Sequence, residues 1–281
     1  MKNIRKSIVT PIACLALTFL FLISCEDDGP GSQNTPIKMF TGYPSDSGNY
    51  WKYDQLFTFA FDPDTVQVEP DSGFNNIHVS VTGHVMMDTL NTIEFSEYDY
   101  SGKYFAKSYF KQHTDGFYIH AYMGGSHAIP TKSNYLYKLG ALTFESQEAL
   151  MESVAGKVSP TLVKDSLFYE DPPVKCWNYP ISISTEWVYR ENGPIGKMTR
   201  KVVGINTVET PAGLFQCYKI KMVYHDTTFA NIIYHDYLSE IGLVKRTLEV
   251  ENVVMMDAEG NEIGVGKSSN ITELTQYSVV K

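Results

Sequence analysis

Three carboxylates on one predicted strand are the best candidates for acid–base chemistry. Glu94, Glu97 and Asp99 fall within the run from Thr92 to Tyr100. Residues two apart on a strand point to the same side, so Glu97 and Asp99 would share a face. Two carboxylates buried in a cleft can act as a general acid and a general base. The pattern would therefore suit a surface-anchored hydrolase acting on glycans, if both side chains lie in one cleft.

A histidine and an aspartate are paired twice in the second half of the chain. The triplets Tyr224-His225-Asp226 and Tyr234-His235-Asp236 would lie on the two arms of a hairpin that turns between Thr228 and Asn231. Imidazole and carboxylate groups together can hold a transition metal. Adjacent residues on a strand face opposite sides, however, so each His and its neighbouring Asp do not enter one site without a bulge. We therefore expect solvent-facing polar pairs and no metal site.

Signature motifs of common enzyme classes are missing from the sequence. It contains no G-x-S-x-G, H-E-x-x-H, C-x-x-C or G-x-G-x-x-G. The stretch from Gly264 to Ser268 matches the end of a phosphate-binding loop, but Asn261 stands where the first glycine of that loop is required. We predict no catalytic residue and no cofactor, and a binding or accessory protein in preference to an enzyme.

Cys25 is the residue with the most specific chemistry, and it ends an apolar leader. A basic start from Lys2 to Lys6 precedes an apolar run from Ile8 to Ile23, which is the layout of a secretory signal peptide. Leu22-Ile23-Ser24-Cys25 resembles the lipobox of bacterial lipoproteins, in which the leader is cut before the Cys and that Cys is lipidated. We predict a lipoprotein signal peptide over residues 1–24 and lipidation at Cys25. The alternative is a plain signal peptide with an incidental Cys.

The polar residues after Cys25 predict a flexible tether and a sorting signal. Glu26, Asp27 and Asp28 follow it directly, and such an acidic run resembles the signal that sends lipoproteins of the Bacteroidota to the outer face of the outer membrane. Residues 25–36 have the Gly- and Ser-containing composition of a flexible tether. We expect a protein anchored to the outer membrane through Cys25 and facing the cell exterior, unless the acidic run is only the solvated start of the tether.

The charge balance argues against one class of partner. The chain has 23 Lys and Arg against 32 Asp and Glu, a formal charge of −9, and removal of the leader with its three basic residues makes this −12. Binding of nucleic acid without sequence preference needs clustered Lys and Arg. We expect no nucleic-acid partner.

One spacing occurs twice and predicts an internal duplication. Tyr43-Pro44, six residues and Trp51-Lys52-Tyr53 are matched by Tyr179-Pro180, six residues and Trp187-Val188-Tyr189. Each Trp and the Tyr two residues later would point to the same side of a strand. We expect Trp51 and Trp187 to be buried anchors of two similar halves, in preference to an exposed platform that stacks on sugar rings.

The pattern of the remaining chain is mostly strand. Runs rich in Val, Ile, Tyr and Phe are separated by Gly, Asp and Ser turns. The predicted strands are 49–61, 77–87, 92–100, 104–112, 117–123, 187–190, 197–208, 214–224, 232–238, 243–253 and 271–280. Only 144–154 has a helical pattern, and 155–178 is predicted as a linker. The fold class is therefore all-β, an antiparallel sandwich or incompletely closed barrel over residues 37–281, built from two similar meander halves of about 43–178 and 179–281 with one short helix.

Three short motifs carry a family resemblance. Tyr43-Pro44 with Gly48 to Tyr53, then Thr210 to Ile220, then Ile241 to Lys245 resemble, in this order, the motifs of a family of Bacteroidota-type lipoproteins. The resemblance implies an antiparallel β fold, similar to that of periplasmic carriers of lipidated proteins, and brings no activity. The ligand could be a glycan, a lipid or a protein. The sequence leaves open whether Cys176 and Cys217 pair.

The lipobox yields a test of anchoring. Cys25→Ala should release the protein from membranes, because the acyl chains that hold it there have no other attachment site. Labelling cells with a fatty-acid analogue and fractionating them checks this, and protease added to intact cells reports on which side the protein lies. An unlabelled wild-type protein would contradict the assignment of Cys25.

Overall fold

The computed structural model of the chain describes residues 39–62, 73–124, 134–157, 167–193 and 195–280. The predicted signal peptide, Cys25 and the tether lie outside these ranges, so they stay predictions. Within the described ranges, no helix has the length and apolar character needed to cross a membrane.

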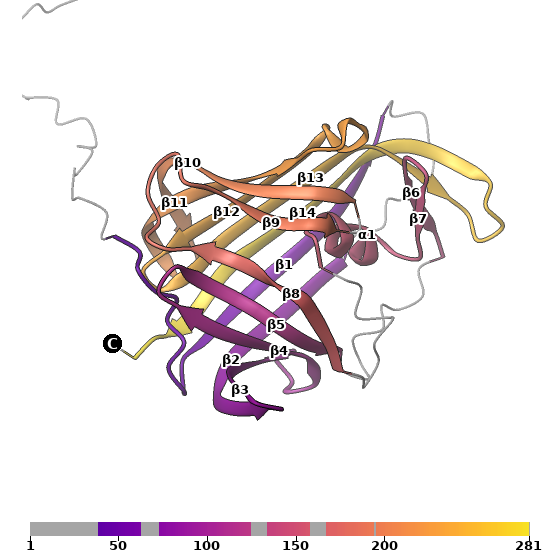
Figure 1. Cartoon of the computed structure of the whole chain (residues 1–281). Helices are drawn as coiled ribbons and strands as arrows, with labels where there is room; N and C mark the ends of the chain where they lie inside the picture. Colours follow the sequence, from indigo (N-terminus) through magenta and orange to yellow (C-terminus); the bar gives the residue numbers. More distant parts are fainter. Residues whose placement is uncertain (1–38, 63–72, 125–133, 158–166, 194, 281) are drawn as a thin grey trace, which may run out of the picture. The chain divides into compact units, whose positions relative to one another are not determined.

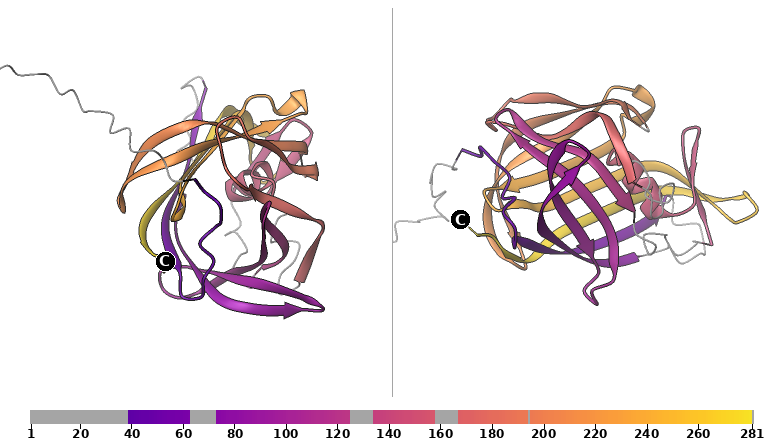
Figure 2. Two further views of the ribbon diagram at one scale, coloured as in Figure 1. Left: turned by 60° about the vertical axis from the view of Figure 1, so that its left-hand side comes forward. Right: turned by 60° about the horizontal axis from the view of Figure 1, so that its bottom comes forward.

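Two antiparallel meanders of six strands each form one sheet that curls into a nearly closed barrel (Figures 1 and 2). This confirms an all-β fold and selects the incompletely closed barrel over the sandwich. The first meander comprises β1 (Tyr50–Phe61), β2 (Gly73–Met87), β3 (Leu90–Tyr98), β4 (Tyr104–His113), β5 (Gly116–Gly124) and β8 (Leu167–Asn178). The second comprises β9 (Glu186–Gly193), β10 (Gly196–Thr210), β11 (Gly213–Tyr224), β12 (Ile232–Ser239), β13 (Gly242–Met256) and β14 (Glu262–Ser278).

The two meanders are joined on one side only. Strands β1 and β14 pair along their length, from Tyr50 opposite Ser278 to Phe61 opposite Gly266. On the other side, no ladder joins β8 to β9 in the described part of the chain, and we call this junction the seam. Pro172 and Pro173 of β8 have no backbone N–H to donate, which is why proline is tolerated on an edge strand. The seam therefore leaves the barrel incompletely closed.

Strand β8 corrects the prediction of a linker over residues 155–178. Residues 167–178 are the sixth strand of the first meander and pair with β5. The pairing is interrupted between Tyr169 opposite Ala121 and Val174 opposite Ile119, where β8 carries four residues against one. Those four residues include both prolines. Because proline is uncommon within strands, the local composition did not indicate a strand here.

A short helix covers the barrel interior at one end. Helix α1 (Gln147–Val154) begins later than the predicted 144, because Ser146 caps it and its hydroxyl accepts from the backbone N–H of Ala149. Its Leu150, Met151 and Val154 are fully buried. A small hairpin of β6 (Leu136–Leu139) and β7 (Leu142–Phe144) precedes it and pairs with β13, and a single 3-10 turn, η2 (Thr227–Phe229), joins β11 to β12.

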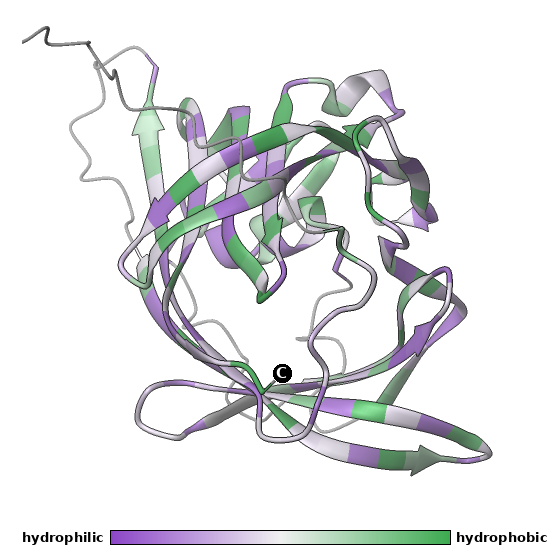
Figure 3. Ribbon diagram, turned by 90° about the vertical axis from the view of Figure 1, so that its left-hand side faces the viewer, coloured by the Kyte–Doolittle hydropathy of each residue, from purple (hydrophilic) through white to green (hydrophobic). Residues whose placement is uncertain are grey.

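Strand periodicity places the core inside the barrel. Along β1, Trp51, Tyr53, Phe57 and Phe59 are buried while Leu56 and Thr58 between them are exposed. Hydrophobic and hydrophilic residues accordingly alternate along many strands (Figure 3). The buried residues form two main clusters, one around α1 and one around Trp51 and Phe95 toward the other end of the barrel. The interior between them remains available for a site.

The repeated motif occupies the first strand of each meander. Trp51 of β1 and Trp187 of β9 are 1% and 7% exposed, as predicted for structural anchors. Each indole N–H is satisfied: Trp51 donates to the carbonyl of Ile241 at 2.6 Å and Trp187 to that of Lys175 at 3.0 Å. The Tyr43 amide also donates to the Tyr179 hydroxyl at 2.7 Å, so the openings of the two copies touch.

These contacts predict a large loss of stability on truncation of either Trp. Trp51→Ala and Trp187→Ala should each lower the free energy of unfolding by about 3 to 5 kcal/mol, since a buried aromatic side chain is removed. The Phe variants should lose less, although each leaves a buried carbonyl without its donor. Thermal melting measures both, and an Ala variant that melts like wild type would refute the anchor role of that Trp.

Candidate functional site

A cavity of about 280 Å³ lies inside the barrel. Its wall takes residues from both meanders and from α1, so neither half forms it alone. The segment 39–49 lies toward the opposite end of the barrel from α1 (Figure 1) and contributes Tyr43 to the wall. The cavity is lined by both apolar and charged side chains, and it is the candidate site.

Four aromatic rings packed against one another form an apolar wall of the cavity. This aromatic wall consists of Tyr43, Phe95, Phe110 and Phe117. The rings of Phe110 and Phe117 stack at 4.7 Å and those of Tyr43 and Phe117 at 5.0 Å, while Phe95 meets Phe110 edge-on at 4.9 Å. Such mutually fixed rings present a preformed apolar face, suited to the flat or aliphatic body of a ligand.

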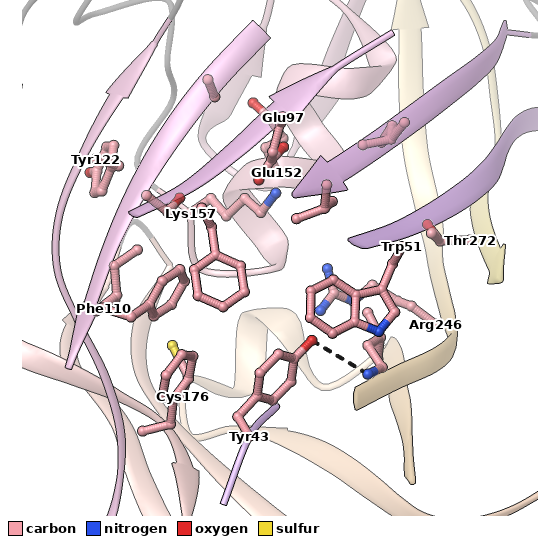
Figure 4. Close-up of a pocket in the computed structure, with 18 of the residues that line it drawn as sticks. Tyr43, Trp51, Glu97, Phe110, Tyr122, Glu152, Lys157, Cys176, Arg246 and Thr272 are labelled. Atoms are coloured by element: carbon pink, nitrogen blue, oxygen red, sulfur yellow. Dashed lines mark hydrogen bonds between the residues drawn. The ribbon is translucent and has the colours of Figure 1, made fainter. Parts of the chain in front are cut away.

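The aromatic wall is held in place by the turn between β12 and β13. Tyr53 donates its hydroxyl to the Leu243 carbonyl at 2.9 Å, and the Leu243 amide approaches the Tyr43 hydroxyl at 3.5 Å, the contact drawn in Figure 4. Burial raises the pKa of Tyr43 to about 12. Gly242 has φ 104° and a Cβ there would lie 2.9 Å from the Tyr43 hydroxyl oxygen, so only glycine fits. The segment around Tyr43 and the segment from Ile241 thus meet at one place.

A buried cluster of two arginines and one carboxylate lies on the strands of the second meander. Arg246 of β13 donates to Asp236 of β12 through Nε at 2.7 Å and Nη2 at 3.3 Å. Arg200 of β10 is 3.5 Å from the same carboxylate, which also accepts from the Tyr234 hydroxyl at 2.9 Å. We call these four residues the arginine cluster. Asp236 is fully buried, and both arginines line the cavity.

Arg200 is positioned by aromatic stacking on two sides. Its guanidinium carbon lies 4.1 Å from the centre of the Tyr189 ring and 4.7 Å from that of Trp177. Nη1 donates to the Cys176 carbonyl across the seam at 2.9 Å. The side chain is only 4% exposed, yet its Nε has no hydrogen-bond partner. A buried guanidinium donor without a partner is rare, and here it belongs to a residue of the cavity wall.

Two carboxylates line a different part of the cavity wall. Glu97 of β3 and Glu152 of α1 lie next to each other in Figure 4, with Lys157 close by and Arg246 away from them. Burial is the main cause of a raised pKa of Glu152, and the charge of Glu97 raises it further while Lys157 lowers it. The site therefore has an acidic side and a basic side.

The predicted pairing of Glu97 with Asp99 does not form. Asp99 is outside the strand, where its carboxylate accepts from the backbone amides of Ser101 at 2.9 Å and Lys103 at 2.8 Å. These hydrogen bonds hold Asp99 in an exposed turn, away from the cavity that Glu97 lines. Glu94 is not among the cavity residues either and forms an ion pair with Lys107 at 3.0 Å. The carboxylate pair proposed for a hydrolase is thus separated by the turn that ends β3.

The two histidine triplets do not form a common site, and Asp236 of the second triplet does not face solvent. Asp226 caps the η2 turn by accepting from the Thr228 amide at 2.8 Å, and His225 contacts the Thr199 hydroxyl at 3.2 Å. Asp236 instead turns inward to the arginine cluster, so the expectation of a solvent-facing pair is wrong for it. His235 faces the other side of β12, and burial lowers its pKa to about 4. The described residues contain no group of three potential metal ligands.

The two remaining cysteines are free thiols in the structure. Cys217 is fully buried on β11, as expected for a small core side chain. Cys176 is half-buried and lines the cavity. Burial raises the pKa of the Cys176 thiol, while Arg200 lowers it to a smaller extent.

The sequence contained a signal for the arginine cluster that composition alone does not reveal. Arg200 lies two residues from the buried Met198 and Val202. Arg246 lies two residues from the buried Val244 and Leu248. Because side chains alternate along a strand, a charged residue at such a position must point inside. Glu152 gave no comparable signal, since α1 could have presented that face to solvent.

Part of the second meander matches the model of a known family. Residues 182–258 match the DUF3108-like family model. The chain is similar to the structure of a candidate lipoprotein from Parabacteroides distasonis, with 13% identity over 86% of this chain and 99% of that one and a TM-score of 0.34. It is also similar to a candidate exported protein with a YmcC-like fold from Bacteroides fragilis, with 12% identity, 86% and 100% coverage and a TM-score of 0.31.

The chain has a weaker similarity to a third structure. A LolA superfamily protein from Nitrosomonas europaea matches at 9% identity over 86% of this chain and 89% of that one, with a TM-score of 0.20. No curated protein matches the chain. At such TM-scores the site has to be interpreted from this chain's own residues.

The raised pKa of Glu152 predicts how one substitution changes stability with pH. The folded state keeps the Glu152 proton to higher pH than the unfolded state, whose carboxyl titrates near 4.5. Ionisation therefore destabilises the fold as pH rises above that value. Glu152→Gln should raise the melting temperature at pH values near 8 and have little effect near pH 4.

The matched control is Glu148→Gln on the same helix. Glu148 lies in the first turn of α1, where a negative charge is favourable. Its removal should leave the melting temperature unchanged or slightly lower at both pH values. An equal gain in melting temperature for both variants would contradict burial as the cause of the raised pKa of Glu152. So would a gain for Glu152→Gln that does not depend on pH.

Proposed function

We propose that this chain is a membrane-tethered binding protein of the cell envelope, not an enzyme, and that its barrel interior holds a small ligand with an apolar body. The observation that carries the proposal is the cavity of about 280 Å³ beside the aromatic wall. Ligand sites are characteristically concave and largely apolar, with few polar groups that fix orientation. The cavity combines the aromatic wall with charged side chains at two places, Arg200 and Arg246 at one and Glu97 and Glu152 at the other.

The distribution of functional groups supports binding in preference to catalysis. Of the two carboxylates that the sequence suggested for hydrolysis, Glu97 lines the cavity and Asp99 is held in its turn. Arg190, at the seam, pairs with Glu170 through both Nη atoms. The arginines of the cavity wall thus have carboxylate partners, and the aromatic wall offers an apolar face. The carboxylates that line the cavity, Glu97 and Glu152, lie beside Lys157 and away from Arg246.

The tether completes the proposal. Lipidation at Cys25 would hold the barrel at the membrane through a leash of residues 25–36, and the acidic run after Cys25 favours the outer face of the outer membrane. The matched structures named as a lipoprotein and an exported protein are compatible with this location. A glycan ligand is less favoured than an apolar one, because Trp51 and Trp187 are buried in the core and offer no open stacking platform.

Binding of an uncharged apolar probe tests the proposal. Phenylnaphthylamine, whose fluorescence rises in apolar surroundings, should bind the mature wild-type protein with one saturable site. Ala106→Phe combined with Ser108→Phe should weaken binding about tenfold or more, because both small side chains line the cavity on one face of β4 and their enlargement fills it.

The control variant is Thr207→Phe, which adds a ring of the same size at an exposed position of β10. It should bind the probe like wild type. Circular dichroism verifies that all variants are folded. Failure of the wild type to bind, or equal binding by the filled and unfilled proteins, would refute a ligand site inside the barrel.

A further inference from the structure

The arginine cluster carries more positive charge than its own residues compensate. Arg200 and Arg246 share a single carboxylate, Asp236, which is fully buried. The neighbouring groups on the strands packed around them are uncharged phenols, an indole and the Cys176 carbonyl. One positive charge is therefore left over in a region of low dielectric, where an unpaired charge is costly.

The unused hydrogen-bond donors lie in the same place. Asp236 takes two of the five N–H groups of Arg246. Arg200 gives Nη1 to a backbone carbonyl, and its Nη2 lies 3.5 Å from both the Tyr234 hydroxyl and Asp236. Its Nε has no partner although the side chain is almost fully buried. Both residues are part of the cavity wall. A guanidinium with free donors in a cavity wall matches the planar geometry of a carboxylate or phosphate group.

We propose that Arg200 and Arg246 form an anion subsite, so that the ligand is an acidic amphiphile: an apolar body against the aromatic wall and a carboxylate or phosphate at the arginine cluster. This inference rests on the proposed function and adds the chemical class of the ligand. The anionic group supplies the second negative charge that two arginines require. It also accepts from donors that the protein leaves unsatisfied.

The opposite charges of the cavity fix the direction in which such a ligand lies. Glu97 and Glu152 line the wall away from Arg246 (Figure 4), and their charge repels an anionic group. Lys157 moderates this repulsion close to Glu152. The acidic end of the ligand is consequently directed to the second meander and the apolar body to the rings of the first.

A pair of probes that differ by one charged group tests the subsite. Anilinonaphthalene sulfonate has the ring system of phenylnaphthylamine plus one anionic sulfonate. The wild-type protein should bind the sulfonate probe more tightly than the neutral probe. Arg200→Gln and Arg246→Gln should each weaken the sulfonate probe about tenfold or more, the cost of losing a charge-assisted hydrogen bond, and leave the neutral probe within about twofold.

Lys201→Gln is the matched control for the charge change. Lys201 is the next residue on β10, its side chain is 46% exposed, and it points away from the cavity. The variant should bind both probes like wild type. If the two arginine variants are folded and bind the sulfonate probe like wild type, or lose both probes equally, the anion subsite is refuted.

A series of displacement experiments on the wild-type protein tests the anion subsite even if an arginine variant does not fold. Dodecanoate and dodecyl phosphate should displace phenylnaphthylamine at lower concentrations than dodecanol, and the stronger of the two shows whether the group is a carboxylate or a phosphate. Equal displacement by dodecanol overturns the anion subsite and leaves the apolar cavity intact. Absence of phenylnaphthylamine binding, in contrast, overturns the proposed function itself.

Discussion

The pairing of the first strand with the last is the interaction on which the rest of the structure depends. Strands β1 and β14 lie about 200 residues apart in the chain, and their continuous ladder joins the two meanders into one barrel. It also sets Trp51 and Tyr53 against the turn at Ile241 to Leu243, where both find their hydrogen-bond acceptors. Without this ladder, the aromatic wall and the arginine cluster would belong to separate sheets and enclose no cavity.

The seam is the counterpart of that ladder, and side chains hold it together. Trp187 and Arg200 each donate to a carbonyl of β8, and Arg190 pairs with Glu170 of the same strand. Side-chain bonds of this kind separate more readily than a ladder of backbone bonds, because each can be exchanged for water individually. The β1–β14 junction is thus held by a continuous backbone ladder and the β8–β9 junction by side-chain bonds, next to the cavity that Cys176 and Arg190 line.

Charge placement inside the barrel separates structural from binding roles. Glu170 neutralises Arg190, and both belong to the seam. Asp236, in contrast, faces two arginines and neutralises only one of them. A buried imbalance of this kind lowers stability unless something compensates it, and stability given up at one place is a common mark of a functional site. The aromatic rings stacked on Arg200 make its retention in the interior tolerable without a second carboxylate.

The sequence by itself determined what local patterns encode: the strands, whose two-residue alternation fixes one buried face, the glycine turns, and the burial of Trp51 and Trp187. It failed at β8, because Pro172 and Pro173 remove the local strand signal and only pairing with β5 defines that strand. The tertiary structure alone decided which charges meet. Asp99 lies in a turn outside the cavity. Glu152, Arg200 and Arg246 line the cavity, although each is more than forty residues from the next along the chain. A cavity wall is made of residues from many strands, and their proximity follows from barrel closure, which no local spacing expresses.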